Sequence, residues 1–147
     1  MWSLFYNCFV TNNKLFACGI NEQGQLGLGD RARRNTLQEL LLKEIQIISI
    51  SCGIYHTMAL TKRGEIYGWG NNGYGQIGLG YASQVAVLIP TKISLDKIFL
   101  SISCGSFHTI AVTIYNDLYV WGHNKIGQLG LADYTDRHAP SLLEFKF

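Results

Sequence analysis

The chain has 147 residues, the length of one ordinary domain, and 48 % of them are hydrophobic, so it can bury a core and is not disordered by composition. Its formal net charge of +2 is too small to indicate a nucleic acid or an acidic membrane surface as the partner. The sequence contains no run of about 18 apolar residues, so no membrane-spanning helix is predicted. The chain has only four cysteines, which favours a reducing compartment, the cytoplasm or the nucleus.

Short strands separated by tight turns are expected along the whole chain, because it contains 16 glycines and only 2 prolines. Residues 9–11 resemble the later segment 59–61, so we expect the chain to start inside a structural unit. A short helix competes with strand at 37–47. Its counterpart 90–99 contains Pro90 and β-branched residues, however, so strand or loop is expected in both segments.

Two further strands are indicated by a period of two. Apolar and serine residues alternate from 48 to 52 and again from 100 to 104, as in a half-buried strand. A hairpin is expected after the first of them, with strands at 56–61 and 66–69. The turn between these strands, at 62–65, contains the glycine that such turns favour.

Two sequence blocks recur with a period of about 51 residues. The first reads Gly-Gln, then Leu or Ile, then Gly-Leu, and Gly24, Gly75 and Gly127 mark its copies at spacings of 51 and 52. The second reads Cys-Gly-x-x-His-Thr and occurs twice, beginning at Cys52 and Cys104. We interpret both blocks, with the tryptophan before the first one, as a structural repeat. Its residues are Gly24, Gln25, Gly27, Cys52, Gly53, His56, Trp69, Gly75, Gln76, Gly78, Cys104, Gly105, His108, Trp121, Gly127, Gln128 and Gly130.

A unit of about 50 residues with about four strands is typical of one β-propeller blade. We therefore predict an all-β fold in which a single domain, 1–147, forms three blades of about four antiparallel strands, a partial and open propeller. The repeat units are approximately 1–36, 37–88 and 89–147. A blade cannot bury both faces alone, so the leucines of the first block and the tryptophans are expected to fill the space between blades.

These motifs resemble the repeat of the regulator of chromosome condensation family over nearly the whole chain. The resemblance implies a propeller that is seven-bladed in complete members. The founding member is an exchange factor for the small GTPase Ran and binds chromatin, and many relatives use the propeller to bind partners. Three repeats leave two open blade edges. We therefore expect a fragment, a partial gene product, or a chain completed by another copy, with self-association through these edges as one outcome.

Two motifs suggest a cofactor or a metal but have simpler explanations. Gly73-x-Gly75-x-x-Gly78 matches a dinucleotide-binding pattern, yet no helix start follows it, and the other copies lack the first glycine. Each Cys-Gly-x-x-His segment has zinc-ligand residue types, but residues four apart along a strand lie roughly 13 Å apart. We expect no cofactor and no metal. The histidines are predicted to bond the backbone near the central channel, and the cysteines to pack as small apolar groups.

The loops after the first block differ between copies, so recognition is expected there. They should line one propeller face. The candidate partner contacts are Arg31, Arg33, Arg34, Asp133, Asp136 and Arg137, with the three arginines of the first loop as anchors. The alternative is that these are ordinary solvent-exposed loops, which would have the same kind of sequence.

No catalytic constellation stands out, so we predict a non-catalytic protein-interaction module and not an enzyme. The alternative is guanine-nucleotide exchange on a Ran-like small GTPase, which needs differential binding rather than covalent chemistry. The absence of an insertion between the repeats speaks against exchange. Chromatin binding is poorly supported by one arginine cluster and a net charge of +2.

Overall fold

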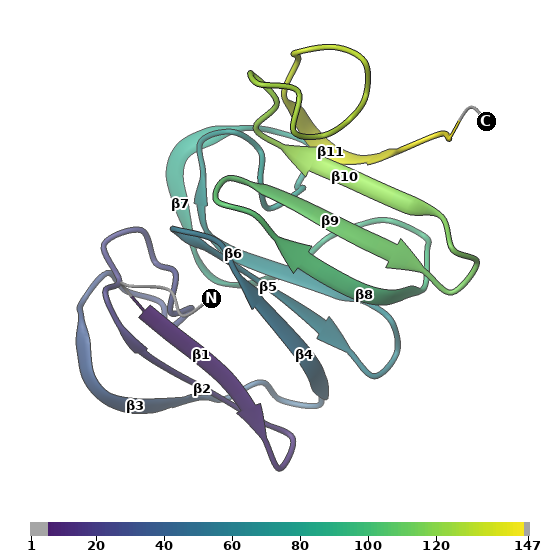
Figure 1. Ribbon diagram of the computed structural model, residues 1–147. Helices are drawn as coiled ribbons and strands as arrows, with labels where there is room; N and C mark the ends of the chain where they lie inside the picture. Colours follow the sequence, from purple (N-terminus) through teal and green to yellow (C-terminus); the bar gives the residue numbers. More distant parts are fainter. Residues whose placement is uncertain (1–5, 146–147) are drawn as a thin grey trace.

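The computed structural model describes residues 6–145, and every regular element in that range is a β-strand. The eleven strands form three antiparallel sheets, here called blades 1, 2 and 3, which follow one another across the molecule in Figure 1. Blade 1 contains β1 (Tyr6–Thr11), β2 (Lys14–Gly19) and β3 (Arg34–Leu40). Blade 2 contains β4 (Ile47–Cys52), β5 (His56–Thr61), β6 (Ile66–Asn72) and β7 (Ser83–Lys92). Blade 3 contains β8 (Phe99–Cys104), β9 (His108–Thr113), β10 (Leu118–Gly122) and β11 (Arg137–Leu142).

The predicted all-β architecture of antiparallel blades is confirmed. Strands within each blade pair in chain order, and blades 2 and 3 each have the four expected strands. A counterpart of β4 and β8 in blade 1 would precede β1, so it lies outside the described residues. Residues 6–145 contain no helix that could cross a lipid bilayer.

The sheets end later than the predicted repeat units. Blades 1 and 2 end at Leu40 and Lys92, whereas the units were placed at 1–36 and 37–88 with the last at 89–147. The unit ends therefore fall inside β3 and β7. The reason is that the outermost strand of each blade follows a long loop and then pairs back onto the preceding strand, β2 with β3 and β6 with β7.

The hairpin predicted from the glycine turn is confirmed. β5 and β6 pair in antiparallel register, with Leu60 opposite Ile66, and Gly64 in the turn has a φ of 76°. A residue with a side chain is strained at that φ, so glycine favours this turn. The segments predicted as strand or loop, 37–47 and 90–99, are also confirmed, since each contains the end of one strand, a connection and the start of the next strand.

The hydrophobic core lies between blades rather than inside one sheet. One cluster joins blades 1 and 2 and includes Leu15, Leu26 and Trp69. A second cluster joins blades 2 and 3 and includes Met58, Phe99 and Trp121. Blades 1 and 3 each pack a face against blade 2, and the apolar area buried there stabilises the stack by about 25 cal/mol per Å².

Trp69 and Trp121 each pack on the first block of the preceding blade, in the interface where they were predicted. The Trp69 indole Nε1 donates a hydrogen bond of 2.9 Å to the backbone oxygen of Gln25. Gly27 lies against the same ring, and a Cβ at Gly27 would sit 2.8 Å from Trp69 Nε1. Glycine is therefore needed in the block because the neighbouring blade's tryptophan occupies the space where a side chain would begin.

Candidate functional site

The repeated histidine of blade 2 bonds a side chain of the next blade. His56 is fully buried, and its Nε2 lies 3.2 Å from the Thr109 hydroxyl. That hydroxyl donates to the backbone oxygen of Gln76 at 2.8 Å, so its proton is already used and His56 Nε2 carries the donated proton. The predicted bond to the backbone is thus replaced at His56 by a bond to Thr109, because stacking of the blades brings this side chain of blade 3 within reach of the imidazole.

Burial makes His56 unsuitable as an acid or base near neutral pH. Desolvation, and secondarily His108, lowers the pKa of His56 to about 3, so the ring is neutral. Gly53 sits directly beside the ring, where a Cβ would overlap it, and Gly105 has the same relation to His108. In each Cys-Gly-x-x-His block, the histidine ring therefore packs against the glycine three positions before it.

Blade 1 has a tyrosine in the place of this histidine. Tyr6 lies opposite Gly19 as His56 lies opposite Gly70. The Tyr6 hydroxyl donates to the backbone oxygen of His56 at 2.6 Å, and the Thr57 hydroxyl, which donates to the backbone oxygen of Gln25, lies 3.2 Å away. Both positions thus join one blade to the next, and the position is a structural joint rather than a chemical site.

Glutamine side chains shape the turn of each Gly-Gln block, and those of Gln25 and Gln76 are fully buried. The side-chain oxygen of Gln76 accepts from the backbone N–H of Tyr74 at 2.9 Å, and its Nε2 donates to Asn71 Oδ1 at 2.7 Å. Gln25 and Gln128 accept in the same way from residues two positions earlier. These contacts explain why glutamine recurs in the block.

Three buried asparagines recur at one repeat position, although the predicted set of structural repeat residues does not include them. Their side-chain oxygens accept from the backbone of the first block at 3.0 to 3.2 Å, and their Nδ2 atoms donate to carbonyl oxygens in the following loop. They are Asn21, Asn72 and Asn124. Their recurrence at one repeat position was the sequence signal that could have identified them. Their contacts show that they hold the loops in shape, so recurrence here does not indicate a partner-binding residue.

Several predicted partner contacts organise their own loops. Arg34 pairs with Asp30 at 2.6 Å, and Arg137 pairs with Asp133 at 2.6 Å, in the same four-residue spacing. Each arginine holds the pKa of its aspartate below the usual value, mainly through the hydrogen bond it donates. Asp136 accepts the backbone N–H of Asn124 at 2.8 Å, so it too is a loop contact.

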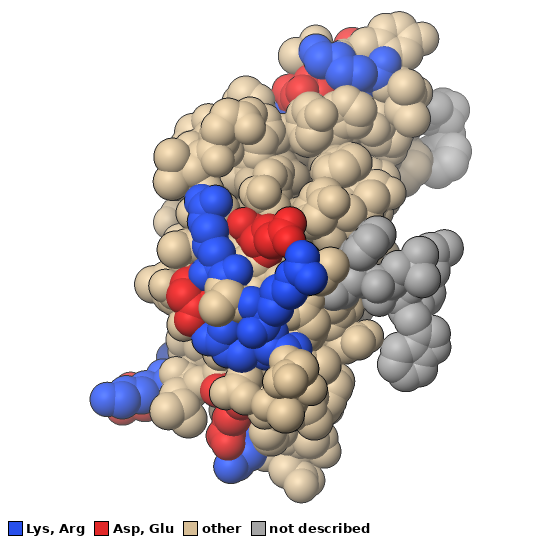
Figure 2. All heavy atoms as spheres, turned by 90° about the vertical axis from the view of Figure 1, so that its left-hand side faces the viewer, with Lys and Arg blue, Asp and Glu red and all other residues tan. Residues whose placement is uncertain are grey.

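Arg31 and Arg33 remain exposed on the loop of blade 1. Arg33 forms an ion pair of 2.6 Å with Glu22. On the face shown in Figure 2, basic and acidic side chains lie next to each other rather than in separate patches. A mixed surface of this kind suits a protein partner better than a polyanion.

All of these loops lie at one end of the blades, which we call the loop face: residues 20–33, 53–55, 71–82, 105–107 and 123–136. The strand registers place them together, because His56 lies opposite Gly70 and Asn72 lies opposite Ser83. A bond of 3.1 Å from Asn71 Nδ2 to Gln23 Oε1 joins blades 1 and 2 there.

An aromatic cluster on the loop face spans blades 2 and 3. Its members are Tyr55, Tyr74, Phe107 and His123. The Tyr74 ring centroid lies 4.4 Å from that of His123 and 5.5 Å from that of Phe107, and Tyr74 is 39 % exposed. Sequence reasoning missed this cluster, although an aromatic residue directly precedes each repeated histidine, at Tyr55 and Phe107.

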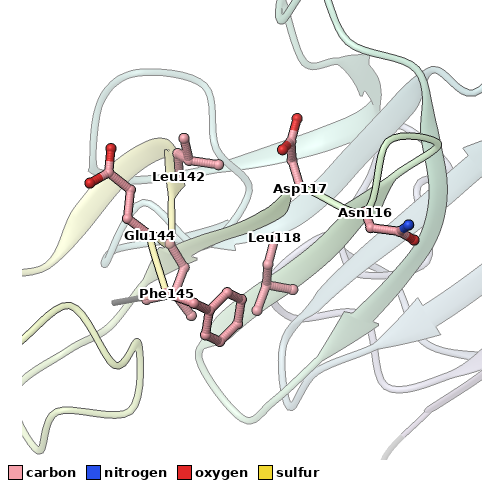
Figure 3. A pocket seen from close by; sticks show the side chains of 7 residues that line it. Asn116, Asp117, Leu118, Leu142, Glu144 and Phe145 are labelled. Atoms are coloured by element: carbon pink, nitrogen blue, oxygen red, sulfur yellow. The ribbon is translucent and has the colours of Figure 1, made fainter. Parts of the chain in front are cut away.

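A hollow of about 410 Å³ lies at the opposite end of blade 3, between the β9–β10 turn and the end of β11. In Figure 3 the carboxylates of Asp117 and Glu144 do not converge, and Leu118 and Phe145 supply apolar wall. Converging polar groups are what orient a small ligand. The hollow is therefore a poor candidate for a ligand site.

Among residues 6–145, no three His, Cys, Asp or Glu side chains gather in a geometry that would hold a metal ion. Cys52 and Cys104 are half-buried on the inner strands β4 and β8. Gly73, Gly75 and Gly78 lie in the turn after β6, and strand rather than helix comes next along the chain. That turn therefore lacks the helix N-terminus that a dinucleotide phosphate requires.

Comparison with protein families agrees with the repeat geometry. The family described as regulator of chromosome condensation (RCC1) repeat matches residues 12–60 and 63–112, and a second description of the same repeat matches 47–76 and 99–128. The chain belongs to the RCC1 repeat family. The predicted resemblance is thereby confirmed, and the two matched RCC1 segments contain both recurring blocks.

RCC1 repeats of very different proteins are similar to this chain. The rat protein named "Probable E3 ubiquitin-protein ligase HERC4" is 41 % identical over 106 residues, covering 70 % of this chain and 10 % of that protein. The Arabidopsis thaliana "Ultraviolet-B receptor UVR8" is 38 % identical over 131 residues, covering 88 % of this chain and 30 % of the receptor. The chain thus spans a third or less of either relative.

A solved RCC1-type structure has the same fold. The crystal structure of Prp20p from Saccharomyces cerevisiae matches with a TM-score of 0.89 and 27 % identity, covering 96 % of this chain and 36 % of Prp20p. Human WBSCR16 matches with a TM-score of 0.63 at 19 % identity, which supports the fold alone. The prediction of a partial, open propeller is confirmed for the described residues.

Proposed function

We propose that this chain is a non-catalytic protein-binding module that uses its loop face. The observation that carries the proposal is the aromatic cluster of Tyr55, Tyr74, Phe107 and His123, which gathers across two blades. Aromatic side chains are enriched where proteins bind one another, because they bury much area at little entropy cost. The repeated polar residues, by contrast, are used in contacts within and between blades.

The comparisons support a scaffold role. A ubiquitin ligase and a light receptor share this repeat although their named activities differ. What the repeat has in common among such proteins is therefore a surface rather than a reaction. Arg31 and Arg33 belong to the same loop face, and we include them as polar contacts at the edge of the proposed surface.

The test compares two exposed tyrosines at opposite ends of the blades. Tyr74 lies on the loop face, and Tyr115, which is 77 % exposed, lies in the turn between β9 and β10. Proteins cross-linked to the wild-type chain and to Tyr115→Ser, but lost with Tyr74→Ser and Phe107→Ser, would support the proposal. Equal binding by all four proteins would refute it, provided that all four unfold at similar temperatures.

Nucleotide exchange on a small GTPase is the second candidate. The solved structure of Prp20p was described together with its binding to Gsp1p and histones, and its backbone matches this chain closely. The test measures release of a fluorescent guanine nucleotide from a panel of small GTPases. Acceleration at substoichiometric concentrations, abolished by Tyr74→Ser, would establish exchange and overturn the non-catalytic reading. Binding without acceleration would reject exchange.

A further inference from the structure

The four rings of the aromatic cluster are fixed in position by hydrogen bonds of their own loops. The Tyr55 carbonyl accepts from the Asn71 N–H at 2.8 Å, and the Phe107 carbonyl accepts from the His123 N–H at 2.9 Å. The Tyr74 N–H donates to the glutamine side chain of its own block at 2.9 Å, and His123 Nδ1 lies 2.7 Å from the glutamine amide nitrogen of its block. A surface fixed in this way loses little conformational freedom when a partner binds.

The rings form one continuous aromatic surface across blades 2 and 3. The Phe107 centroid lies 6.5 Å from that of Tyr55 and 5.5 Å from that of Tyr74, and Tyr74 lies 4.4 Å from His123. Tyr74 is exposed, and the other three side chains are partly exposed. All four rings therefore offer apolar area to a partner.

The loops that carry these rings have almost no charge. Segments 53–55, 71–82 and 105–107 contain no Asp, Glu, Lys or Arg, and the nearest charged residue along the chain is Lys125, two positions after His123. The other charged residues of the loop face lie in the blade 1 loop, 20–33, and near the end of the blade 3 loop, 123–136. A strongly charged segment placed on the rings would lose hydration without meeting opposite charges. Charge complementarity therefore favours an uncharged partner segment.

Two hydroxyl groups of the cluster are available as hydrogen-bond donors. Within residues 6–145, neither the Tyr55 nor the Tyr74 hydroxyl has a hydrogen-bond partner. Each can therefore donate to a carbonyl oxygen of a partner. A proline-rich segment in the polyproline II conformation has no internal hydrogen bonds, and proline has no N–H, so it presents acceptors and almost no donors. The two surfaces are complementary.

The cluster occurs once in the described chain, although the blades repeat. The position of Tyr74, directly before the glycine of the first block, is occupied by Gln23 in blade 1 and by Ile126 in blade 3. A site built from repeat residues would recur in each blade. A site centred on Tyr74 instead predicts one bound segment per chain.

We propose that the aromatic cluster binds an uncharged, proline-rich segment of a partner protein in the polyproline II conformation. The inference rests on the proposed protein-binding function of the loop face and states the chemistry of the partner. Pyrrolidine rings pack on the aromatic rings, and the Tyr55 and Tyr74 hydroxyls donate to peptide carbonyls. Such a segment advances roughly 3.1 Å per residue, so about six residues are enough to cross the cluster.

The test titrates the isotope-labelled full chain with decaproline and, as a control, with a Gly-Ser peptide of the same length. Decaproline should shift the amide signals of 54–55, 73–75 and 106–107 at one-to-one stoichiometry, and the Gly-Ser peptide should not. Peptides of alternating Pro-Glu and Pro-Lys should bind more weakly than decaproline, because the rings have no counter-charge.

Three variants separate the ring from its hydroxyl. Tyr74→Phe keeps the ring and loses the donor, so it should weaken decaproline binding by about three- to tenfold. Tyr74→Ser should weaken binding further. Tyr134→Ser is the matched control, since Tyr134 is 69 % exposed on the same loop face but lies outside the cluster. It should bind like the wild type.

Four outcomes would overturn the proposal. Decaproline shifts no signal of the cluster, the Gly-Ser peptide shifts the same signals equally, a charged peptide binds more tightly than decaproline, or Tyr134→Ser weakens binding as much as Tyr74→Ser. The first three comparisons use only the wild type, so they hold even if a variant fails to fold. If decaproline fails while cross-linking to partners still depends on Tyr74, the chemistry of the partner is rejected and the protein-binding function stands.

Discussion

The glutamine side chain of each Gly-Gln block has a hydrogen-bond partner for its Nε2 in blades 2 and 3 but not in blade 1. Gln76 donates to Asn71 and Gln128 bonds His123, each five residues earlier. The equivalent position in blade 1 is Ile20, which offers no acceptor, and Gln25 Nε2 is buried without a hydrogen-bond partner. An unpaired buried amide costs free energy, so blade 1 carries a local defect that its sisters do not have.

Replacing Ile20 with asparagine should correct this defect. We expect Ile20→Asn to exceed Ile20→Ala in free energy of unfolding by about 1 kcal/mol, because only asparagine can accept from Gln25 Nε2. Alanine is the reference since both variants lose the isoleucine packing. Urea unfolding measures the difference. Equal midpoints for the two variants would show that the Gln25 amide is satisfied in another way.

His56 should make stability depend on pH. Its folded pKa is about 3, far below the value of about 6.5 for an unfolded histidine. The unfolded chain therefore binds the extra proton between these values. The stability that neutral His56 provides is complete above about pH 6.5 and is lost as the pH falls toward 3.

The measurement compares the wild type with His56→Gln, which keeps a hydrogen-bond donor but cannot titrate. Between pH 6 and pH 4, the wild type should lose about 1.4 kcal/mol more per pH unit than the variant. His108, whose pKa burial also lowers, is present in both proteins and cancels in the comparison. Parallel pH profiles would mean that His56 is hydrated or charged in the folded chain.

At the scale of elements, blades are joined by side chains that reach across to a neighbouring backbone. Trp69 bonds the carbonyl of Gln25, and Thr109 bonds the carbonyl of Gln76. The carbonyls that accept these bonds are free because the Gly-Gln block turns instead of pairing as a strand. The turn thus supplies hydrogen-bond acceptors to the next blade. This explains why the sequence of the block recurs so closely from one repeat to the next.

Two glycines of one turn should respond differently to alanine. Gly78 and Gly80 both have positive φ, of 92° and 89°, but a Cβ at Gly78 would lie 2.8 Å from Trp121 Nε1, while at Gly80 it meets nothing within 4 Å. Gly80→Ala should cost about 1 kcal/mol, from backbone strain alone. Gly78→Ala should cost about 2–4 kcal/mol, because the tryptophan must also move. Thermal unfolding measures both, and equal costs would contradict this account of the interface.

At the scale of the whole molecule, the described blades form an arc in which blade 2 joins the other two (Figure 1). The main contacts between blades run from β1 to β4 and from β4 and β5 to β8. Stability in such a stack is a sum over blades and their junctions. Weakening one junction should therefore loosen one blade selectively.

Hydrogen exchange should reveal this selectivity. Trp69→Ala removes the buried indole between blades 1 and 2 and should raise exchange in β1–β3, leaving β8–β10 protected. Trp121→Ala should do the reverse, raising exchange in blade 3 first. Mass spectrometry of peptides from each blade measures both patterns. A uniform rise in all three blades after either substitution would indicate that the described residues unfold as one unit.

The repeat, the strand pattern and the residues between blades were determined by the sequence itself. Alternation of apolar and polar residues at 48–52 indicates a half-buried strand whatever its neighbours are. A glycine between two predicted strands likewise indicates a tight turn in which that glycine has a positive φ. Recurrence of Trp69 and Trp121 was enough to predict an interface, because identical units that stack must present the same surface to each other.

Only the tertiary structure decided which partner each of these residues meets. Trp69 bonds Gln25 across 44 residues and His56 reaches Thr109 across 53, and no local pattern specifies such distances. The stacking also gathered the aromatic cluster from two blades. Local periodicity reports which face of a strand is buried, but contacts across blades depend on how whole sheets pack, and that is set only when the chain is folded.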